Sequence, residues 1–273
     1  MKLLAAIITA TIPFTVMAAN IDIEPIPDLP LNNVPSASAT EKAQPANVWK
    51  FSLGGGLSYA PRYEGAASNR LLFMPLLEAN YNNGQIFISP LRGVGYNFSD
   101  DRTMQYGVRL APDRIRYQSD DPRLNGMGDL RFTPQAGLFF NKRFSAWYIS
   151  SGINTGIHGT NAELGSGFLF PVSAVDRVRI GVNLNWGDTK YNQTYFGVTA
   201  GQAAASGNVL TAYSAGAGLM DYAATTNWLH NYDRKWFSNA GLSYKWLGTS
   251  AQLSPLTQRS SMASGNFLVG YRF

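Results

Sequence analysis

The chain has 273 residues, of which only 14% are charged, whereas a typical soluble domain has about 25%. Aromatic residues make up 13%, and 27 residues are glycine. The mean hydropathy of -0.13 is too low for a helical membrane protein, and no later run of about 18 apolar residues could span a bilayer as a helix. The net charge of +5 comes without a basic cluster, so nucleic-acid binding is not indicated. This composition is typical of a membrane β-barrel.

The first 48 residues differ from the rest of the chain. Lys2, the apolar stretch Leu3–Val16 and small residues before Asn20 predict a secretory signal peptide over 1–19. The alternative is an N-terminal membrane anchor, although the apolar run is short for a span. Residues 20–48 are rich in Pro, Ala, Ser and Asn, which predicts a disordered periplasmic segment. The chain contains no cysteine, so disulfides cannot stabilise it.

From Trp49 onward the sequence predicts strand after strand. Residues 176–187 alternate strictly between large apolar side chains at even positions (Val178 to Trp186) and Arg, Gly or Asn at odd positions. The polar faces are crowded with Gly, Asn, Ser and Arg, which fits a barrel lumen better than the wet face of a soluble sandwich. The strands expected are 49–60, 70–81, 85–90, 92–98, 103–113, 129–141, 143–157, 161–172, 176–187, 217–231, 235–248 and 262–273.

The connections between these strands alternate between short turns and mostly longer loops. Among the short ones are 82–84 and Asn141–Lys142, whereas 114–128 and 188–216 are long. Short turns at one end and long loops at the other are typical of outer-membrane barrels. We therefore expect an all-β fold, an antiparallel transmembrane β-barrel over 49–273 with about twelve strands. Ten strands are the fallback if 85–90 and 92–98 merge and one other strand is misassigned.

The longest connection also contains a helix signal. Thr199 and Gln202 have the spacing of a capping box, and three alanines follow. A short helix in a long extracellular loop is therefore expected. Tyr195, Phe196 and Gly197 precede it, and the two aromatic side chains would be exposed unless the loop folds into the barrel mouth or meets a partner. Both alternatives, a plug and a partner loop, are open.

Several basic residues are expected inside the lumen, because they lie on the polar faces of predicted strands. They would make an open pore prefer anions, or pair with loop acids if the lumen is plugged; they are Arg109, Arg177, Arg179, Lys245 and Arg272. A second basic group, Arg114, Arg116, Arg123 and Arg131, surrounds a long loop. These four arginines could bind lipopolysaccharide phosphates or pair locally with Asp113, Asp120, Asp121 and Asp129.

Catalytic signals are weak. His158 lies at the end of the predicted strand 143–157, near Ser150 and Ser151 in sequence. Some outer-membrane hydrolases use a Ser–His pair, but nothing fixes the required geometry here. An ordinary His at the barrel rim is the simpler interpretation, and Asp120–Asp121 is interpreted as a solvated pair because it lacks the spacing of a calcium loop. No catalytic, cofactor or metal site is expected.

The sequence also resembles a known family. The strings "YNQTYFGVTAGQAAASG" (191–207) and "AYSAGAGLMD" (212–221) resemble its signature region, as does 51–81 with its Tyr63-Glu64-Gly65. The C-terminal string at 254–273 is similar as well. On this basis the chain resembles the MltA-interacting protein (MipA/OmpV) family of outer-membrane proteins.

The resemblance implies a barrel in the bacterial outer membrane, in contact with lipid and lipopolysaccharide. The name-giving member of the family is a scaffold that joins a lytic transglycosylase to a peptidoglycan synthase, so we expect a non-enzymatic, monomeric scaffold. The alternative is a porin-like channel for small solutes. Tyr271 and Phe273 end the last strand in the manner of the signal that the outer-membrane assembly machinery recognises.

Overall fold

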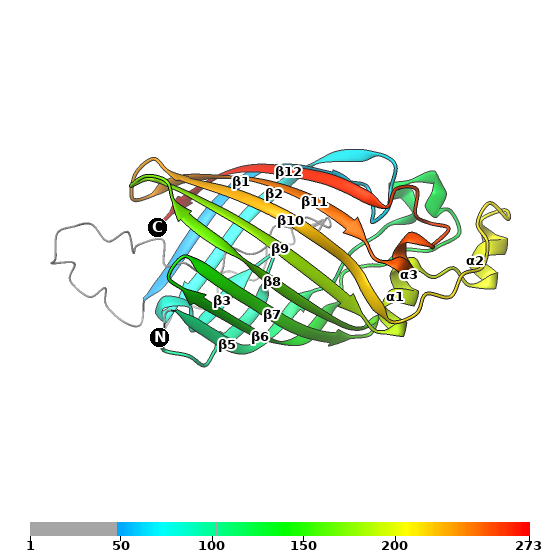
Figure 1. Cartoon of the computed structure of the whole chain (residues 1–273), viewed down its shortest axis with the longest axis horizontal. Coiled ribbons are helices and arrows are strands. Elements are labelled where there is room, and N and C mark those ends of the chain that lie inside the picture. Colours follow the sequence, from blue (N-terminus) through cyan, green and yellow to red (C-terminus); the bar gives the residue numbers. More distant parts are fainter. Residues whose placement is uncertain (1–47, 102) are drawn as a thin grey trace, which may run out of the picture.

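The computed structural model describes residues 48–101 and 103–273, in which twelve strands form a closed barrel (Figure 1). The predicted signal peptide and all but the last residue of the predicted segment 20–48 lie outside the described residues. The strands are β1 (Trp49–Pro61), β2 (Asn69–Tyr81), β3 (Ile86–Ser89), β4 (Gly93–Asn97), β5 (Met104–Pro112), β6 (Pro134–Phe144), β7 (Trp147–Gly156), β8 (Gly159–Pro171), β9 (Asp176–Gly187), β10 (Gly218–Asn231), β11 (Trp236–Leu247) and β12 (Ser261–Arg272).

Each strand pairs antiparallel with its neighbours in the chain, and β1 closes the barrel against β12, from Ser52–Arg272 to Tyr59–Gly265. The prediction of twelve antiparallel strands is confirmed. The ten-strand fallback is excluded, because β3 and β4 pair with each other as separate strands, from Ile86–Tyr96 to Ser89–Gly93. A closed ladder lets nearly every backbone polar group of the wall find a partner within the sheet, as a lipid environment requires.

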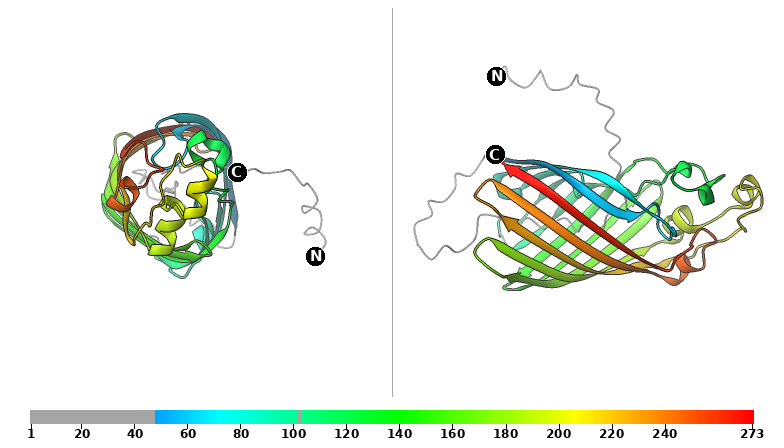
Figure 2. Two further views of the ribbon diagram at one scale, coloured as in Figure 1. Left: turned by 90° about the vertical axis from the view of Figure 1, so that its right-hand side faces the viewer. Right: turned by 90° about the horizontal axis from the view of Figure 1, so that it is seen from above.

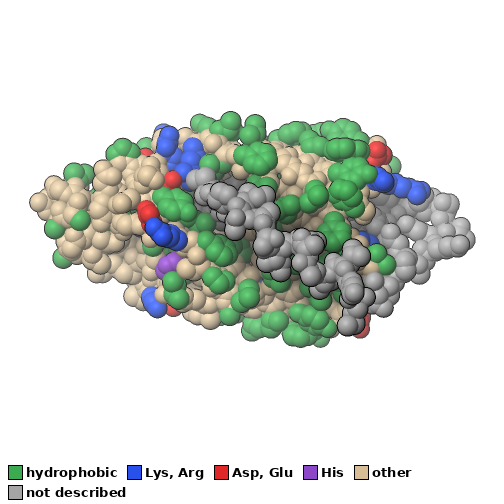
Figure 3. All heavy atoms as spheres, turned by 180° about the vertical axis from the view of Figure 1, so that it is seen from behind, with side chains coloured by type: hydrophobic (Ala, Val, Ile, Leu, Met, Phe, Trp, Pro, Cys, Tyr) green, Lys and Arg blue, Asp and Glu red, His purple; other side chains and the backbone are tan. Residues whose placement is uncertain are grey.

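The alternation of side chains decides which face of the wall meets the surroundings. In β9, Ile180 and Val182 are 51% and 57% exposed, whereas Arg179 before them is 4% exposed. Apolar side chains cover much of the outside of the barrel, with charged side chains nearer its two ends (Figure 3). Apolar area left in water costs about 25 cal/mol per Å², so this belt is suited to lipid.

The two ends of the barrel differ in their connections. The short-turn end contains the two chain ends of the barrel, Trp49 and Phe273, and five connections: 82–85, 98–103, 145–146, 172–175 and 232–235 (Figure 2). The long-loop end contains 62–68, 113–133, 157–158, 188–217 and 248–260, whereas the connection 90–92 of the short β3–β4 hairpin lies part-way along the wall. The helices α1 (Thr189–Phe196), α2 (Ala200–Ala205) and α3 (Thr249–Gln252) all belong to the long-loop end. No helix in the described part of the chain has the length and apolarity needed to cross a membrane.

Two predicted boundaries are wrong around β6. The predicted turn at Asn141–Lys142 lies inside the strand, opposite Ser150 and Ile149, and the turn comes at Ser145, which has a φ of 36°. The ammonium group of Lys142 forms an ion pair with Asp101 of the turn 98–103, with Nζ 3.1 Å from Oδ2. The predicted start at residue 129 is also too early. Asp129 belongs to the loop, where its carboxylate accepts a hydrogen bond from the Gln118 N–H.

One hairpin of the wall is much shorter than the others. β3 has 4 residues and β4 has 5, whereas β2 has 13. As a result β2 pairs with β3 only from Ala79–Ile88 to Tyr81–Ile86, and the rest of β2 pairs only with β1.

Candidate functional site

The loops of the long-loop end fold over the barrel mouth and form a cap (Figure 2). We define the cap by its two apolar clusters, which draw residues from the connections 62–68, 113–133, 188–217 and 248–260 and from the ends of three strands. One cluster consists of Tyr191, Tyr195, Phe196, Ala215, Met220, Leu247, Ala251 and Met262. The other consists of Tyr63, Ala66, Leu124, Met127, Val198, Leu210 and Leu256. Because each cluster joins segments far apart in sequence, the cap is a packed unit and not a set of independent loops.

Helix α1 forms the inner layer of the cap. Asp188 is its N-cap and accepts a hydrogen bond from the Tyr191 N–H at 2.7 Å, which satisfies one of the free donors of the first turn. Tyr191 and Tyr195 are four residues apart and therefore lie on one face, where both are buried with Phe196. Gly159 passes close to this helix with a φ of +117°, and a Cβ there would lie 2.5 Å from Tyr191 N.

Helix α2 confirms the predicted short helix. The Thr199 hydroxyl accepts from the Gln202 backbone N–H at 3.2 Å, and the Thr199 N–H donates to the side-chain Oε1 of Gln202 at 2.9 Å, which completes the capping box. The Gln202 side chain also donates to the Met127 carbonyl at 3.0 Å and so ties this loop to 113–133. Gly197 ends α1, and its N–H donates to the Gln193 carbonyl.

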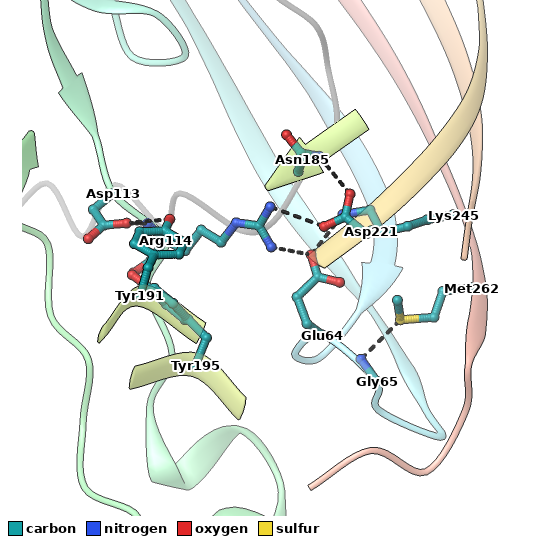
Figure 4. A network of polar contacts seen from close by, with 10 residues as sticks. All are labelled: Glu64, Gly65, Asp113, Arg114, Asn185, Tyr191, Tyr195, Asp221, Lys245 and Met262. Carbon is teal, nitrogen blue, oxygen red and sulfur yellow. Dashed lines mark hydrogen bonds and ion pairs between the residues drawn. The ribbon is translucent and has the colours of Figure 1, made fainter. Parts of the chain in front are cut away.

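A charged network lies beneath the apolar clusters, where loop residues meet the inner wall (Figure 4). Arg114 Nη1 lies 3.1 Å from Glu64 Oε1, and its Nη2 lies 3.3 Å from Asp221 Oδ2. Lys245 Nζ lies 2.7 Å from the same Glu64 oxygen and 4.0 Å from Asp221 Oδ2. The Asn185 amide donates to Asp221 Oδ1 at 2.6 Å. Two cations and two anions therefore neutralise one another in a largely buried position.

A second polar group links the loop 113–133 to α1. Asp113 accepts from the Tyr191 hydroxyl at 2.9 Å and lies 2.7 Å from His158 Nδ1. Arg116 donates to the Tyr195 carbonyl at 2.8 Å, and the Tyr195 hydroxyl donates to the Arg114 carbonyl at 3.0 Å. Burial raises the pKa of both tyrosine hydroxyls, so they stay protonated and able to donate. Burial also lowers the pKa of Arg116 to about 10.

The side chains of three loop arginines bond to partners that the sequence did not suggest. Arg114 pairs with Glu64 and Asp221, Arg116 with a backbone carbonyl, and Arg123 with the Pro255 carbonyl at 2.9 Å. Asp120 is also not the solvated rim acid that the sequence suggested. It is 6% exposed and forms an ion pair with Arg70.

The five predicted lumen cations have different surroundings. Lys245 belongs to the charged network, and Arg109 forms an ion pair with Glu163 on β8 and donates to Asn154 at 3.1 Å. Arg179 lies 5.5 Å from the centre of the Tyr148 ring. Arg272 donates to Asn231 at 2.9 Å and stacks 4.1 Å over the Phe237 ring. For Arg177 and Arg272 no acidic partner lies within 4.0 Å among residues 48–101 and 103–273.

The suggested Ser–His pair does not form. Ser151 precedes His158 by seven residues, nearly all of them within β7, which corresponds to roughly 20 Å at about 3.3 Å per residue. The Ser151 hydroxyl instead lies 3.4 Å from the Phe140 carbonyl. Within the described ranges no three His, Cys, Asp or Glu side chains are grouped so that they could hold a metal ion.

The predicted assembly signal lies at the short-turn end. Tyr271 packs against Trp236 with ring centroids 5.0 Å apart and against Phe273 at 4.9 Å. The Phe273 N–H donates to the Phe51 carbonyl at 2.9 Å, so the last residue still belongs to the ladder.

The sequence analysis missed Glu64, Asn185 and Asp221 as members of one site. The available signal was the placement of Asn185 and Asp221 on the inward faces of β9 and β10, where they are direct register partners. Glu64 lies in a loop, and its position over the mouth depends on the tertiary fold.

Comparisons with known proteins find similarities to solved structures and to one protein family. The anion-selective porin from Comamonas acidovorans is 8% identical, with 84% of this chain and 99% of that chain covered and a TM-score of 0.41. The Pseudomonas putida toluene transporter TodX is 9% identical, with 84% and 90% covered and a TM-score of 0.36. No curated protein sequence matches the chain. Residues 53–273 match the family described as MltA-interacting protein MipA, and the chain therefore belongs to that family.

Proposed function

We propose that this protein is a non-enzymatic scaffold of the outer membrane, which holds a lytic transglycosylase and a peptidoglycan synthase at its short-turn end. The observation that carries the proposal is the packed cap over the mouth. Two apolar clusters and a neutralised charged network fill the long-loop end. A barrel built in this way is better suited to presenting a surface than to conducting solutes. The description of its family as MltA-interacting supports a lytic transglycosylase as one partner.

The proposed docking surface consists of the short turns. In bacterial outer-membrane barrels, short turns face the periplasm, where enzymes of the cell wall act. Five turns and both ends of the barrel chain lie together there. The segment 20–48, which precedes β1, would emerge on the same side and could add reach to the contact.

Cross-linking from single cysteines tests the position of the contact, because the native chain has none. Ala146→Cys and Ala174→Cys place a photo-cross-linker on exposed residues of two short turns, and Ala204→Cys is the matched control on exposed α2. Each variant is reconstituted in nanodiscs and exposed to a purified lytic transglycosylase. We expect adducts from the two turn positions and none from Ala204→Cys. Adducts from all three positions, or from none, would contradict docking at the short turns.

Conductance in planar bilayers tests the porin-like alternative on the same preparations. The scaffold proposal expects no ion current from the native barrel. A steady, ohmic current that is unchanged by disruption of the cap would favour a channel. Deletion of 20–48 in parallel would show whether the partner contact needs that segment.

A further inference from the structure

The wall of the barrel contains an interruption beside β2. Among the described residues, no strand pairs with Asn69–Glu78 on the side away from β1, because the β3–β4 hairpin ends at 90–92 (Figure 1). Where the hairpin is present, β2 and β5 are three strand spacings apart, or about 14 Å at about 4.8 Å each. Beyond the end of the hairpin, no strand of the described residues lies between β2 and β5.

The register identifies which backbone groups face this interruption. The Phe273 N–H donates to the Phe51 carbonyl. The backbone N–H and C=O groups of odd-numbered residues in β1 therefore bond to β12, and those of even-numbered residues bond to β2. In the regular β1–β2 ladder Gly54 opposes Leu76. The backbone N–H and C=O groups of the odd-numbered residues of β2 therefore point away from β1. Pro75 is one of them, and proline has no N–H to offer at an unpaired edge.

The interruption is framed on all sides, and we call it the window. On one side it is bounded by Leu71–Leu77 of β2, and on the other by the last residues of β5 and the first part of the loop 113–133. At its long-loop edge Arg70 Nη1 pairs with Asp120 Oδ1 at 2.5 Å. At its edge toward the short-turn end, Arg92 Nη2 lies 3.1 Å from Glu78 Oε2. Two ion pairs thus tie β2 to the neighbouring segments where the ladder does not.

An apolar cluster lies inside the barrel directly behind the window. It consists of the buried side chains of Met74, Leu229, Phe237 and Leu268, with Leu76 and Leu91 packed against it. The neighbouring inward side chains of β10 to β12 are largely polar, such as Asn227, Asn239 and Asn266. An apolar patch on an otherwise polar inner wall, next to the interruption, is explained if an apolar ligand binds there.

We propose that the window admits an acyl chain from the surrounding lipid and that the apolar cluster is its binding site. The lipid-facing belt continues to the rim of the window, where Leu71 and Phe73 are 62% and 70% exposed and Leu110 is 56% exposed. A chain entering past Pro75 meets Leu76 and Leu91 and then the buried cluster. Unpaired backbone groups in hydrocarbon cost several kcal/mol each, so an interruption at this depth is better explained by a role than by chance. This inference does not depend on the scaffold proposal.

A second copy of the chain does not fit the same edge. Two barrels in one membrane share their orientation, so their β2 strands would run in the same direction. Related by an axis along the membrane normal, strands tilted by about 40° would cross one another and could not form a ladder.

Quenching by brominated lipid tests the proposal. Single cysteines replace Leu76 behind the window, Leu71 on the lipid face as positive control, and Leu169 as negative control. Leu169 also points inward and is partly exposed, but it lies in intact wall between β7 and β9. Each cysteine carries a bimane fluorophore, and the barrels are reconstituted into phosphatidylcholine vesicles with dibrominated acyl chains. Heat-modifiable gel mobility checks that each variant is folded.

We expect the Leu76→Cys label to be quenched nearly as strongly as the Leu71→Cys label and several-fold more than the Leu169→Cys label. Adding Leu91→Arg should remove the quenching at position 76 and leave that at position 71 unchanged. Quenching at position 76 that matches position 169 overturns the proposal. So does strong quenching at position 76 by aqueous iodide but not by brominated lipid, because the window would then hold water.

Discussion

The charged network of the cap makes a quantitative prediction for Asp221→Asn. The substitution keeps the shape of a side chain that is fully buried and removes its charge. Arg114 and Lys245 then share only Glu64, so the network changes from neutral to a net charge of +1. Removing one partner of a buried ion pair typically costs about 3 to 5 kcal/mol, because the other charge stays buried without compensation.

The double variant Asp221→Asn/Lys245→Met sharpens this prediction. Lys245→Met alone should cost a similar amount, because it leaves two carboxylates with only Arg114 between them. The double variant restores neutrality, with one anion (Glu64) and one cation (Arg114) that are already 3.1 Å apart. We therefore expect it to lose clearly less free energy of unfolding than the sum of the two single variants.

Urea unfolding in lipid vesicles, followed by tryptophan fluorescence, measures these free energies. Protease cleavage within 188–217 under native conditions reports in parallel whether only the cap opens. Additive single effects, or single effects below about 0.5 kcal/mol, would refute the reasoning, because side chains that interact this closely should be coupled.

Three further outcomes follow from the cap. Burial raises the pKa of Tyr63 from 10.0 to about 12. The stabilisation that the protonated Tyr63 hydroxyl gives to the fold is therefore present below pH 10 and lost as the pH rises toward 12. By urea unfolding, Tyr63→Phe should lose about 1 kcal/mol less stability than the native protein between about pH 8 and about pH 11. Thr199→Ala should raise the rate of protease cleavage at α2 about fivefold, because a lost N-cap costs about 1 kcal/mol. Gly159→Ala should destabilise the fold by about 2 kcal/mol or more, seen as a lower urea midpoint, since its φ is +117° and the new Cβ would contact Tyr191 N.

The strands could be predicted because their information is local. In β9 the alternation of Arg179, Ile180, Gly181 and Val182 determines the direction of every side chain, whatever the strand pairs with. The capping box at Thr199 and Gln202 is equally local, since three residues contain the whole signal. The turn beyond β6 was misplaced for the opposite reason, because Lys142 stays in the strand through a contact with Asp101, forty-one residues earlier in the chain.

The site could not be predicted because its contacts are distant in sequence. Glu64 and Lys245 are 181 residues apart, and Arg114 and Asp221 are 107 apart. Periodicity predicted that Lys245 lies on the inward face of its strand, but it could not show which acid reaches it. Helix α1 was missed because its Asp188 N-cap lacks a Glu or Gln three residues on, and its stability comes from burying Tyr191, Tyr195 and Phe196 under other loops.

The packing of the cap bears on the choice between scaffold and channel. To open, the cap would have to separate Arg114 from Glu64 and Asp221 and expose two apolar clusters at the same time. Each step alone is unfavourable by several kcal/mol, and the steps are coupled because Arg114 lies directly next to Asp113, which binds Tyr191. A minor open state would therefore be very rare, since 1.4 kcal/mol already corresponds to about a tenfold change in population. A pore gated by this cap would need a ligand that supplies the difference, whereas a docking surface at the opposite end needs the cap only to remain closed.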